Sequence, residues 1–272
     1  MVAGAVVALL SSVVPAGAGA ARPAGGSPGC GAEAPEAGWS TGTVDAAGLE
    51  RTYRIFVPDG YDADRRYPVV FVWHGLNGHA EGMARAFPVE RSAGDDAVVV
   101  VPQGLPMVDE RPGWVTAPGR DLELFDVLLD TVRHDLCVDP LRVFSTGMSN
   151  GALMSNFLGC VRSDDLRAIA PLSGGLPVGE RLTCGGEVGA MVVHGSADDM
   201  VPMAVGRNSY RAWRDVDDCH ALSRRWRPTE IEECLTQPGC HPGAPVLWCE
   251  HDGGHVIPPW ASRAVWQFFD SF

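Results

Sequence analysis

The amino-acid sequence predicts an α/β fold, with a mostly parallel, doubly wound sheet in a single domain. Apolar, β-prone runs alternate along the chain with stretches whose apolar residues recur at helical spacing, which is typical of such sheets. Residues 67–73 are apolar without interruption, as expected of a strand that is buried on both faces of a parallel sheet. The 272 residues are enough for one large domain with a sizeable core, so we expect no second domain.

The expected elements follow one another in an order that fits this fold. Residues 41–44 and 51–57 are rich in β-formers and are separated by a turn that contains Gly, so they predict an antiparallel pair at the start. In a doubly wound sheet, ligands bind outside the carboxyl ends of the strands, so the catalytic residues are expected there. The remaining elements are a strand at 67–73, a helix at 83–93, a strand at 97–102, a helix at 122–136, a strand at 142–144, a helix at 152–160, strands at 168–172 and 188–193, a helix at 204–214, a strand at 245–249 and a helix at 258–271.

The first forty residues differ in composition from the rest of the chain. Residues 1–20 are small and apolar and end in Ala-x-Ala patterns, so we interpret them as a signal peptide, although no Lys or Arg precedes the apolar run. Residues 21–39 are rich in Gly, Ala and Pro and are expected to form a flexible leader. The predicted catalytic domain spans residues 40–272. A signal peptide predicts a secreted or periplasmic protein.

The eight cysteines, an even number, indicate up to four disulfides and an oxidising compartment. A zinc site drawn from Cys219-His220, Cys234 and Cys240-His241 is the alternative, but no Cys-x-x-Cys pair occurs, so we expect no metal. Spacing alone does not establish which cysteines pair. Our expected pairs are Cys30–Cys137, Cys160–Cys184, Cys219–Cys249 and Cys234–Cys240.

The charge of the chain limits its partners. There are 21 basic residues, all of them Arg, against 34 acidic ones, which gives a net charge of −13. No basic cluster is present, and this argues against nucleic acid or an anionic membrane surface as a partner. A neutral or weakly charged substrate fits better, and we expect the protein to be a monomer.

One short segment carries the strongest motif. Gly147-Met148-Ser149-Asn150-Gly151 follows the β-prone run 142–144 and precedes a helix-compatible stretch, which is the strand–turn–helix context of a nucleophile elbow. The serine of such an elbow lies on a strained, sharp turn, so the residues two before and two after it must be small. Ser149 is therefore the candidate nucleophile. In a chain with 33 Gly the pattern also arises by chance, so the assignment depends on finding a base, an acid and an oxyanion hole elsewhere in the chain.

Candidate partners follow two later strands. The strand at 188–193 leads to Asp198 and Asp199, either of which could orient a histidine, and we prefer Asp198. The strand at 245–249 leads to His251 and His255. We take His255 as the base because a Gly pair before it allows close approach, whereas His251 lies almost on the strand. A solvated turn with two acidic residues is the alternative for the segment of Asp198.

Two further sets of residues complete the predicted site. Backbone N–H groups of Asn150, directly after the nucleophile, and of Leu76, in the loop after strand 67–73, are the candidate oxyanion donors. His74 and His194 each precede a Gly at a strand end, and we interpret them as residues that organise loops by hydrogen bonding rather than as proton carriers.

Taken together, several motifs resemble those of a known family. They are His74-Gly75, Cys137-Val138-Asp139-Pro140, Thr146-Gly147-Met148-Ser149-Asn150-Gly151, His194-Gly195-Ser196-Ala197-Asp198 and Gly253-Gly254-His255. Over about residues 30–272 the chain resembles the secreted feruloyl esterase and polyhydroxybutyrate depolymerase group of α/β-hydrolases. The resemblance implies Ser149 as nucleophile, Asp198 as acid and His255 as base, and it implies disulfides from Cys30, Cys137 and the Cys219–Cys249 segment. The family usually has Trp-Pro soon after the base, whereas residues 256–260 here are Val-Ile-Pro-Pro-Trp.

The resemblance implies a serine carboxylic-ester hydrolase that needs no cofactor. Ser-Asn-Gly after Met148 is more similar to feruloyl esterases, so the expected substrates are hydroxycinnamate esters of plant polysaccharide, small or attached to a polymer. Trp73, Trp114 and Trp260 lie in or beside the loops at the active end and could stack on an aromatic acyl group. The alternatives are a depolymerase acting on polyhydroxybutyrate or related polyesters, and a secreted binding protein on a hydrolase scaffold.

Overall fold

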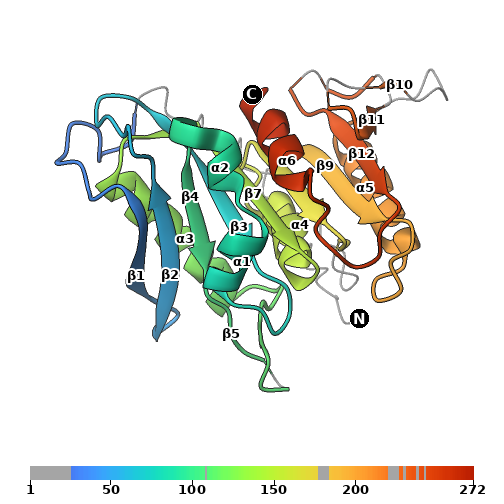
Figure 1. Cartoon of the computed structure of the whole chain (residues 1–272), viewed down its shortest axis with the longest axis horizontal. Helices are drawn as coiled ribbons and strands as arrows, with labels where there is room; N and C mark the ends of the chain where they lie inside the picture. The colour runs from blue at the N-terminus through green and yellow to red at the C-terminus, as the bar shows by residue number, and fades with distance from the viewer. Residues whose placement is uncertain are drawn as a thin grey trace, which may run out of the picture.

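A computed structural model describes residues 26–107, 109–176, 184–219, 227–228, 231–236, 239–241 and 243–272. The predicted signal peptide at 1–20 lies outside the described residues. The described chain is built around one large twisted sheet with helices on both faces (Figure 1). The mostly parallel, doubly wound α/β fold that the sequence predicts is therefore confirmed, and it has the single domain that we expected.

The central sheet is parallel in its middle and antiparallel at its edges. Its spatial order is β1-β2-β4-β3-β7-β8-β9-β12-β11-β10, and the six strands from β4 to β12 run parallel to one another. Because these six strands point the same way, their carboxyl ends form one common edge. The strands are β1 (Gly38–Ala46), β2 (Leu49–Val57), β3 (Tyr67–Trp73), β4 (Val98–Pro102), β7 (Val138–Met148), β8 (Ala168–Leu172), β9 (Gly189–Gly195), β10 (Arg227–Pro228), β11 (Cys234–Thr236) and β12 (Val246–His251).

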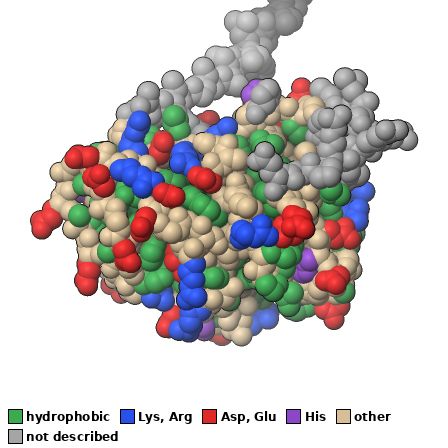
Figure 2. Space-filling model, turned by 45° about the horizontal axis from the view of Figure 1, so that its top comes forward, with side chains coloured by type: hydrophobic (Ala, Val, Ile, Leu, Met, Phe, Trp, Pro, Cys, Tyr) green, Lys and Arg blue, Asp and Glu red, His purple; other side chains and the backbone are tan. Residues whose placement is uncertain are grey.

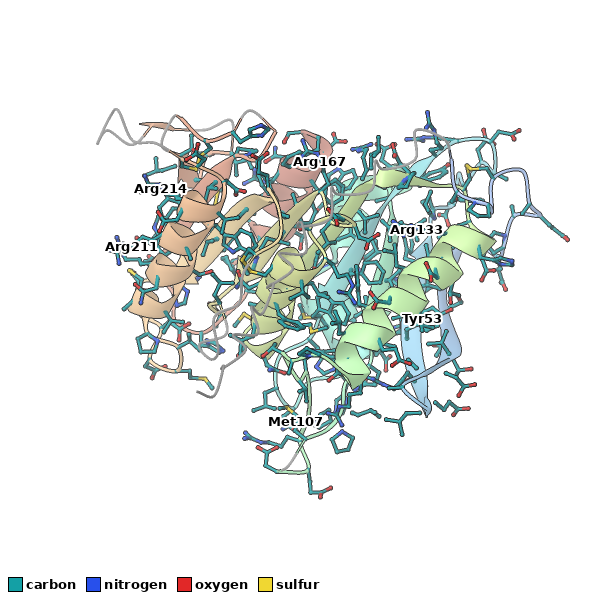
Figure 3. The ribbon with its side chains drawn as sticks, turned by 180° about the vertical axis from the view of Figure 1, so that it is seen from behind. Tyr53, Met107, Arg133, Arg167, Arg211 and Arg214 are labelled. Carbon is teal, nitrogen blue, oxygen red and sulfur yellow. A yellow bond between two sulfur atoms is a disulfide. The ribbon has the colours of Figure 1, made fainter. Side chains whose placement is uncertain are left out.

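Among the described residues, three α-helices cover each face of the sheet. Helices α1 (Ala80–Ala86), α2 (Val89–Ala93) and α6 (Ala261–Asp270) lie on the face turned to the viewer in Figure 1. Helices α3 (Arg120–Asp135), α4 (Asn150–Val161) and α5 (Met203–Val216) cover the other face, which Figure 3 shows. Side chains of β3 alternate between the two cores: Phe71 packs with the second set, and Val70 and Val72 pack with the first. A strand buried on both faces must be apolar throughout, as this one is.

Two parts of the fold differ from the sequence-based expectation. The helix predicted at 83–93 is two helices, because Pro88 has no N–H to donate and its ring disfavours a helical conformation at Phe87, whose φ is −133°. The segment between β4 and α3, for which the sequence indicated no element, contains a small hairpin. It consists of β5 (Leu105–Pro106) and β6 (Pro112–Gly113), and Figure 3 shows Met107 at its outer end.

All eight cysteines are in disulfides, and two of the four expected pairs are confirmed. These are Cys30–Cys137 and Cys160–Cys184. The expected pairs Cys219–Cys249 and Cys234–Cys240 are wrong, since the structure has Cys219–Cys240 and Cys234–Cys249. The reason is the strand β11, which places Cys234 directly opposite Cys249 of β12 in antiparallel register. No thiolate is left for the alternative zinc site, and the described residues contain no cluster of His, Cys, Asp and Glu that could hold a metal.

The predicted leader is held against the domain from Ser27 onward. The Ser27 hydroxyl donates to the carbonyl oxygen of Leu136 and accepts the N–H of Val138, and Cys30 is bonded to Cys137. Strand β1 begins at Gly38, two residues before the predicted boundary of the domain. Residues 21–25 of the leader lie outside the described residues.

The surface agrees with the charge of the sequence. On the face shown in Figure 2, acidic and Arg side chains are interspersed, and no large basic patch is visible. Of the helices that the structure describes, none has the length and apolar character needed to cross a membrane.

Candidate active site

Ser149 lies on a sharp turn between β7 and α4. Its backbone has φ 58° and ψ −117°, a left-handed conformation that non-glycine residues rarely adopt. The Ser149 N–H donates to the carbonyl oxygen of Leu172 at the end of β8 (2.9 Å), which fastens the turn to the neighbouring strand. The sequence motif thus has the strand–turn–helix structure that it predicts.

The glycines of the motif are required by close backbone contacts. A Cβ atom on Gly151 would lie 2.0 Å from the carbonyl oxygen of Trp73, and one on Gly147 would lie 2.6 Å from the same oxygen. Both distances are far below van der Waals contact, so no side chain fits at either position. The turn of Ser149 therefore packs directly on the end of β3.

His255 and Asp198 form a hydrogen-bonded pair at the same edge of the sheet. The distance between His255 Nδ1 and Asp198 Oδ2 is 2.8 Å, and the Asp198 side chain is fully buried while that of His255 is 11% exposed. Of the two acidic residues that the sequence left open, Asp198 is the one bonded to His255, whereas Asp199 is exposed. With Nδ1 donating to the carboxylate, Nε2 of His255 is left as an acceptor.

The carboxylate of Asp198 is held ionised by hydrogen bonds. Burial opposes its charge, but the N–H groups of Val201 (2.8 Å) and Met200 (3.0 Å) donate to Oδ1 and His255 donates to Oδ2, so the pKa of Asp198 is lowered. An ionised carboxylate fixes the tautomer of the imidazole.

The two loops that carry this pair are joined to each other. Ala197 N–H donates to the carbonyl oxygen of Gly253 (3.1 Å), and Ser196 N–H donates to that of His251 (2.7 Å). A Cβ atom on Gly195 would lie 2.3 Å from the Gly253 oxygen, so this position too excludes a side chain. These contacts set the distance between Asp198 and His255.

The other histidines of this edge have different surroundings. His251 accepts the N–H of Gly253 at Nδ1 (3.1 Å), and burial, followed by the nearby His194, lowers its pKa. His194 Nε2 donates to the carbonyl oxygen of Val201 (2.9 Å), and its ring is fully buried. Neither is bonded to Asp198 as closely as His255, since His194 Nε2 is 3.6 Å from Asp198 Oδ2.

The loop after β3 passes directly beside Ser149. A Cβ atom on Gly75 would lie 3.5 Å from Cβ of Ser149, and Leu76 is the next residue. The N–H groups of Asn77 and Gly78 donate to the carbonyl oxygens of Pro112 and Gly75. Within the described part of the chain, no acceptor is bonded to the N–H of Leu76. The structure thus brings the loop of Leu76 beside the turn of Ser149, which Asn150 follows.

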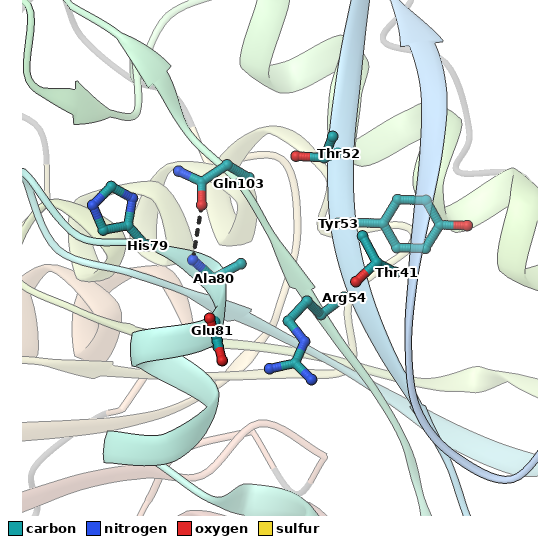
Figure 4. A pocket seen from close by; sticks show the side chains of 8 residues that line it. All are labelled: Thr41, Thr52, Tyr53, Arg54, His79, Ala80, Glu81 and Gln103. Carbon is teal, nitrogen blue, oxygen red and sulfur yellow. Dashed lines mark hydrogen bonds between the residues drawn. The ribbon is translucent and has the colours of Figure 1, made fainter.

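His74 and Gln103 hold both ends of this loop. His74 Nδ1 donates to the carbonyl oxygen of Gly75 (2.8 Å), and its Nε2 accepts the N–H of Gly104 (2.9 Å), while burial lowers its pKa and keeps it neutral. The amide of Gln103 lies 3.4 Å from His74 Nε2 and accepts the N–H of Ala80 at 2.9 Å (Figure 4). Gln103 also lines an open pocket of about 560 Å³ beside α1.

Two of the three predicted substrate-binding tryptophans are buried. Trp73 is 0% exposed and donates its indole N–H to Ser145 Oγ (3.0 Å), and Trp114 is 1% exposed and donates its indole N–H to the carbonyl oxygen of His74 (2.7 Å). These two rings cannot stack on a substrate, so for them the expectation is corrected. Trp260 is half-buried, with its ring edge-on to His251.

Two groups of residues near the site were not predicted from the sequence. The hairpin β5–β6 contacts the loop of Leu76, since the N–H of Asn77 donates to the carbonyl oxygen of Pro112, and its two-residue strands are too short to show a readable periodicity. Exposed apolar side chains also follow the proposed acid and base: Met200 is 72% exposed and Val256 is 51% exposed. Single exposed apolar residues are common, so the sequence offered no reason to select these two.

Comparison with known sequences adds to this geometry. No protein-family model matches the chain. Feruloyl esterase D of Neurospora crassa is 31% identical over 293 residues, which covers 97% of this chain and 95% of the relative. Feruloyl esterase C of Emericella nidulans is 29% identical over 241 residues, covering 80% of this chain and 83% of the relative.

Solved structures share the fold at lower sequence identity. The acetyl xylan esterase from Aspergillus awamori has a TM-score of 0.67 at 16% identity, covering 85% of this chain and 99% of that one. A ferulic acid esterase has a TM-score of 0.61 at 19% identity, covering 85% and 95%. Since the relative from Neurospora crassa is 31% identical over almost the whole of both chains, the chain belongs to the feruloyl esterase family and is a carboxylic ester hydrolase of the α/β-hydrolase fold.

Proposed function

We propose that this protein hydrolyses hydroxycinnamate esters of plant polysaccharide outside the cell, with Ser149, His255 and Asp198 as its catalytic triad. The observation that carries the proposal is the 2.8 Å bond between His255 Nδ1 and Asp198 Oδ2, at the sheet edge where Ser149 adopts a strained turn. The chain order Ser149, Asp198, His255 is the order expected of this fold.

The proposed reaction is acyl transfer in two steps. His255 Nε2 takes the hydroxyl proton of Ser149 while Oγ attacks the ester carbonyl, and Asp198 stabilises the imidazolium that forms. The tetrahedral intermediate collapses, the C–O bond to the alcohol breaks, and His255 returns the proton to the leaving oxygen. Water then repeats these steps on the acyl-enzyme and releases the acid. The residues in these roles need no metal or organic cofactor.

The N–H groups of Asn150 and Leu76 are the proposed oxyanion hole. Asn150 is the first residue of α4, where N–H groups have no partner within the helix, and the helix dipole favours negative charge. Loss of one such donor typically costs about 3–4 kcal/mol of transition-state stabilisation. Leu76 lies in a loop with tight backbone contacts and Asn150 at a helix N-terminus that packs on β3, which supports a preorganised hole.

The aromatic acyl group is the proposed occupant of the apolar rim near His255. Met200 and Val256 expose apolar surface beside the proposed acid and base, and Trp260 offers a partly exposed ring. A planar, mostly apolar hydroxycinnamoyl group would cover such surface favourably. The names of the sequence relatives support the same substrate class.

The proposed location rests on the cysteines. Four disulfides suggest an extracellular protein, because disulfides persist in oxidising compartments. We propose that residues 1–20 direct export and are removed, which N-terminal sequencing of the secreted protein would test.

Labelling with a fluorophosphonate tests the proposed nucleophile. We expect one label on Ser149 and none on Ser149→Ala, together with a loss of esterase activity in that variant. If intact Ser149 stays unlabelled and the variant behaves like the wild type, the triad is wrong. The protein would then act without this serine, as the binding-protein alternative requires.

A panel of esters tests the substrate. Methyl ferulate, a short-chain nitrophenyl ester, acetylated xylan and a polyhydroxybutyrate film separate the candidate substrates. We expect the highest kcat/KM on methyl ferulate. Clearing of the film without release of ferulate would overturn this assignment and favour the depolymerase alternative.

A further inference from the structure

We propose that the side chain of Asn150 is a positioning residue, which holds the loop of Leu76 in place through Trp114. The inference rests on the proposed function and deepens it, because it concerns both donors of the proposed oxyanion hole. The backbone of Asn150 carries one donor. Its side chain binds Trp114, and Trp114 binds the loop that carries the second donor.

Both polar atoms of the Asn150 carboxamide are hydrogen-bonded to the backbone of Trp114. Asn150 Oδ1 accepts the N–H of Trp114 (2.7 Å), and Asn150 Nδ2 donates to the carbonyl oxygen of Trp114 (3.2 Å). Two parallel bonds fix the orientation of a residue as well as its position. Only Asn has a donor and an acceptor at this reach, since Ala has neither and Asp has no donor when ionised.

Trp114 transmits this position to the loop after β3. Its indole N–H donates to the carbonyl oxygen of His74 (2.7 Å), two residues before Leu76, and the ring is 1% exposed. The ring packs edge-on against Trp73, with the centroids 4.9 Å apart. A buried planar ring with few torsions moves as one body, so a shift of the Trp114 backbone would shift the carbonyl of His74.

Trp114 is anchored from its other side by a buried ion pair. The N–H of Val115 donates to Asp121 Oδ2 (2.8 Å), and Asp121 Oδ1 is 2.8 Å from the guanidinium of Arg51. Both charged side chains are 0% exposed. Because Asp121 belongs to α3, the segment cannot move away from this helix without breaking a buried, charge-assisted hydrogen bond, and this fixes the backbone to which Asn150 is bonded.

The hairpin also contacts the side chains of the two residues that carry the proposed donors. A Cβ atom on Gly113 would lie 2.9 Å from Asn150 Oδ1 and 3.0 Å from Leu76 Cδ1, so the backbone of Gly113 is in contact with both side chains. The N–H of Asn77 donates to the carbonyl oxygen of Pro112 (2.7 Å). The hairpin thus links the elbow to the loop of Leu76 by packing and by hydrogen bonds.

This arrangement predicts a specific kinetic defect. When the loop relaxes, the N–H of Leu76 moves away from the position of the oxyanion, and a misplacement of 1 Å typically costs about 100-fold in rate. We expect Asn150→Ala to lower kcat on the preferred ester about 100-fold while KM changes less than about twofold, because the contact strengthens in the transition state.

Matched variants separate positioning from general damage. Trp114→Phe keeps an aromatic ring in the core but removes the N–H that binds His74 together with part of the indole, and Asn150→Asp keeps the acceptor and removes the donor. We expect both to lower kcat about 10-fold or more, and only Asn150→Asp, which leaves the core packed, to keep a melting temperature close to that of the wild type. Asp109→Asn, at the exposed tip of the same hairpin, is the control and should keep full activity.

Two inhibitors report on the oxyanion itself. A trifluoromethyl ketone analogue of the ester forms a tetrahedral oxyanion on Ser149, whereas an ether analogue has no carbonyl oxygen. We expect Asn150→Ala and Trp114→Phe to weaken the binding of the ketone by the same factor by which they lower kcat/KM. The affinity for the ether should stay unchanged. In the double variant the losses should not multiply, because both substitutions break one chain of contacts.

The outcomes are distinguishable. An active wild type whose Asn150→Ala and Trp114→Phe variants keep kcat within about twofold would overturn the inference. It would also be overturned if the variants bound the ketone and the ether more weakly by the same factor, or if the losses in kcat/KM multiplied in the double variant. A wild type that hydrolyses no ester and is not labelled at Ser149 would overturn the proposed function and this inference together.

Discussion

At the scale of single residues, the proposed chemistry depends on which acid faces the base. Asp198 and Asp199 are adjacent and chemically identical, and both follow β9. Only Asp198 is buried, accepts two backbone N–H groups and binds His255. The chain direction after Gly195 decides this, since the turn points one carboxylate inward and the next outward.

We expect Asp198→Asn to lower kcat by about 10⁴-fold, because an amide would present a donor to Nδ1 and favour the wrong tautomer of His255. Asp199→Asn is the matched control and should change kcat by less than about twofold. The measurement is kcat on the preferred ester for both variants, with circular dichroism to confirm folding. Equal losses in both variants would contradict the assignment of the acid.

At the scale of elements, the junction of β7 and α4 leaves no room for side chains at two of its positions. The strand must end so that Gly147 and Gly151 both lie against the carbonyl oxygen of Trp73 in β3. Two elements distant in sequence are therefore in backbone contact beneath Ser149. The same contact brings the loop of Leu76 to the elbow, so the proposed site lies where the end of β3 and its loop meet β7 and α4.

We expect Gly151→Ala to abolish measurable activity and to lower the melting temperature. In an ordinary helix position this change would stabilise the fold by up to about 1 kcal/mol, but here the new Cβ would lie 2.0 Å from the Trp73 oxygen. Gly82→Ala in α1 is the control, because nothing lies within 4 Å of its Cβ position. Thermal unfolding and the esterase rate of both variants test this. A stable and active Gly151→Ala protein would show that the elbow can shift.

At the scale of the whole molecule, a buried acid outside the site affects stability. Asp217 follows α5 and is 0% exposed, and burial raises its pKa to about 7. Its Oδ1 accepts the N–H of Val188 (3.1 Å), and no partner for Oδ2 is found among the described residues. The unfolded chain loses this proton near pH 3.8, whereas the folded chain keeps it to about pH 7.

Because the folded pKa is raised, the contribution of Asp217 to stability is complete below about pH 3.8 and is lost as the pH rises to about 7. One pH unit in this window is worth about 1.4 kcal/mol, so we expect the wild type to lose about 3 kcal/mol between pH 5 and pH 8 through this group. Asp217→Asn should lack that loss. Urea unfolding of both proteins at the two pH values measures it.

The exposed neighbour Asp215 supplies the control for this experiment, since Asp215→Asn should leave the pH dependence of the wild type unchanged. If Asp217→Asn and the wild type lose the same free energy of unfolding between pH 5 and pH 8, the charge of Asp217 does not govern stability in this range.

The disulfides illustrate what local sequence cannot determine. Cys30–Cys137 and Cys160–Cys184 were expected correctly, but the partners of Cys234 and Cys249 depend on a short strand, β11, that has only three residues. Its register against β12 places the two cysteines opposite each other. A strand this short has no readable periodicity, and its pairing is a tertiary contact.

The sequence by itself determined the fold class, the parallel core strands and the candidate nucleophile, because these depend on local apolar patterns and on a motif within five residues. It also narrowed the acid to two adjacent positions. Tertiary structure alone decided that Asp198 rather than Asp199 binds His255, that Trp73 and Trp114 are buried, and that Asn150 is linked through Trp114 to the loop of Leu76. Each of these joins segments far apart in the chain, and such contacts follow from packing rather than from any local pattern.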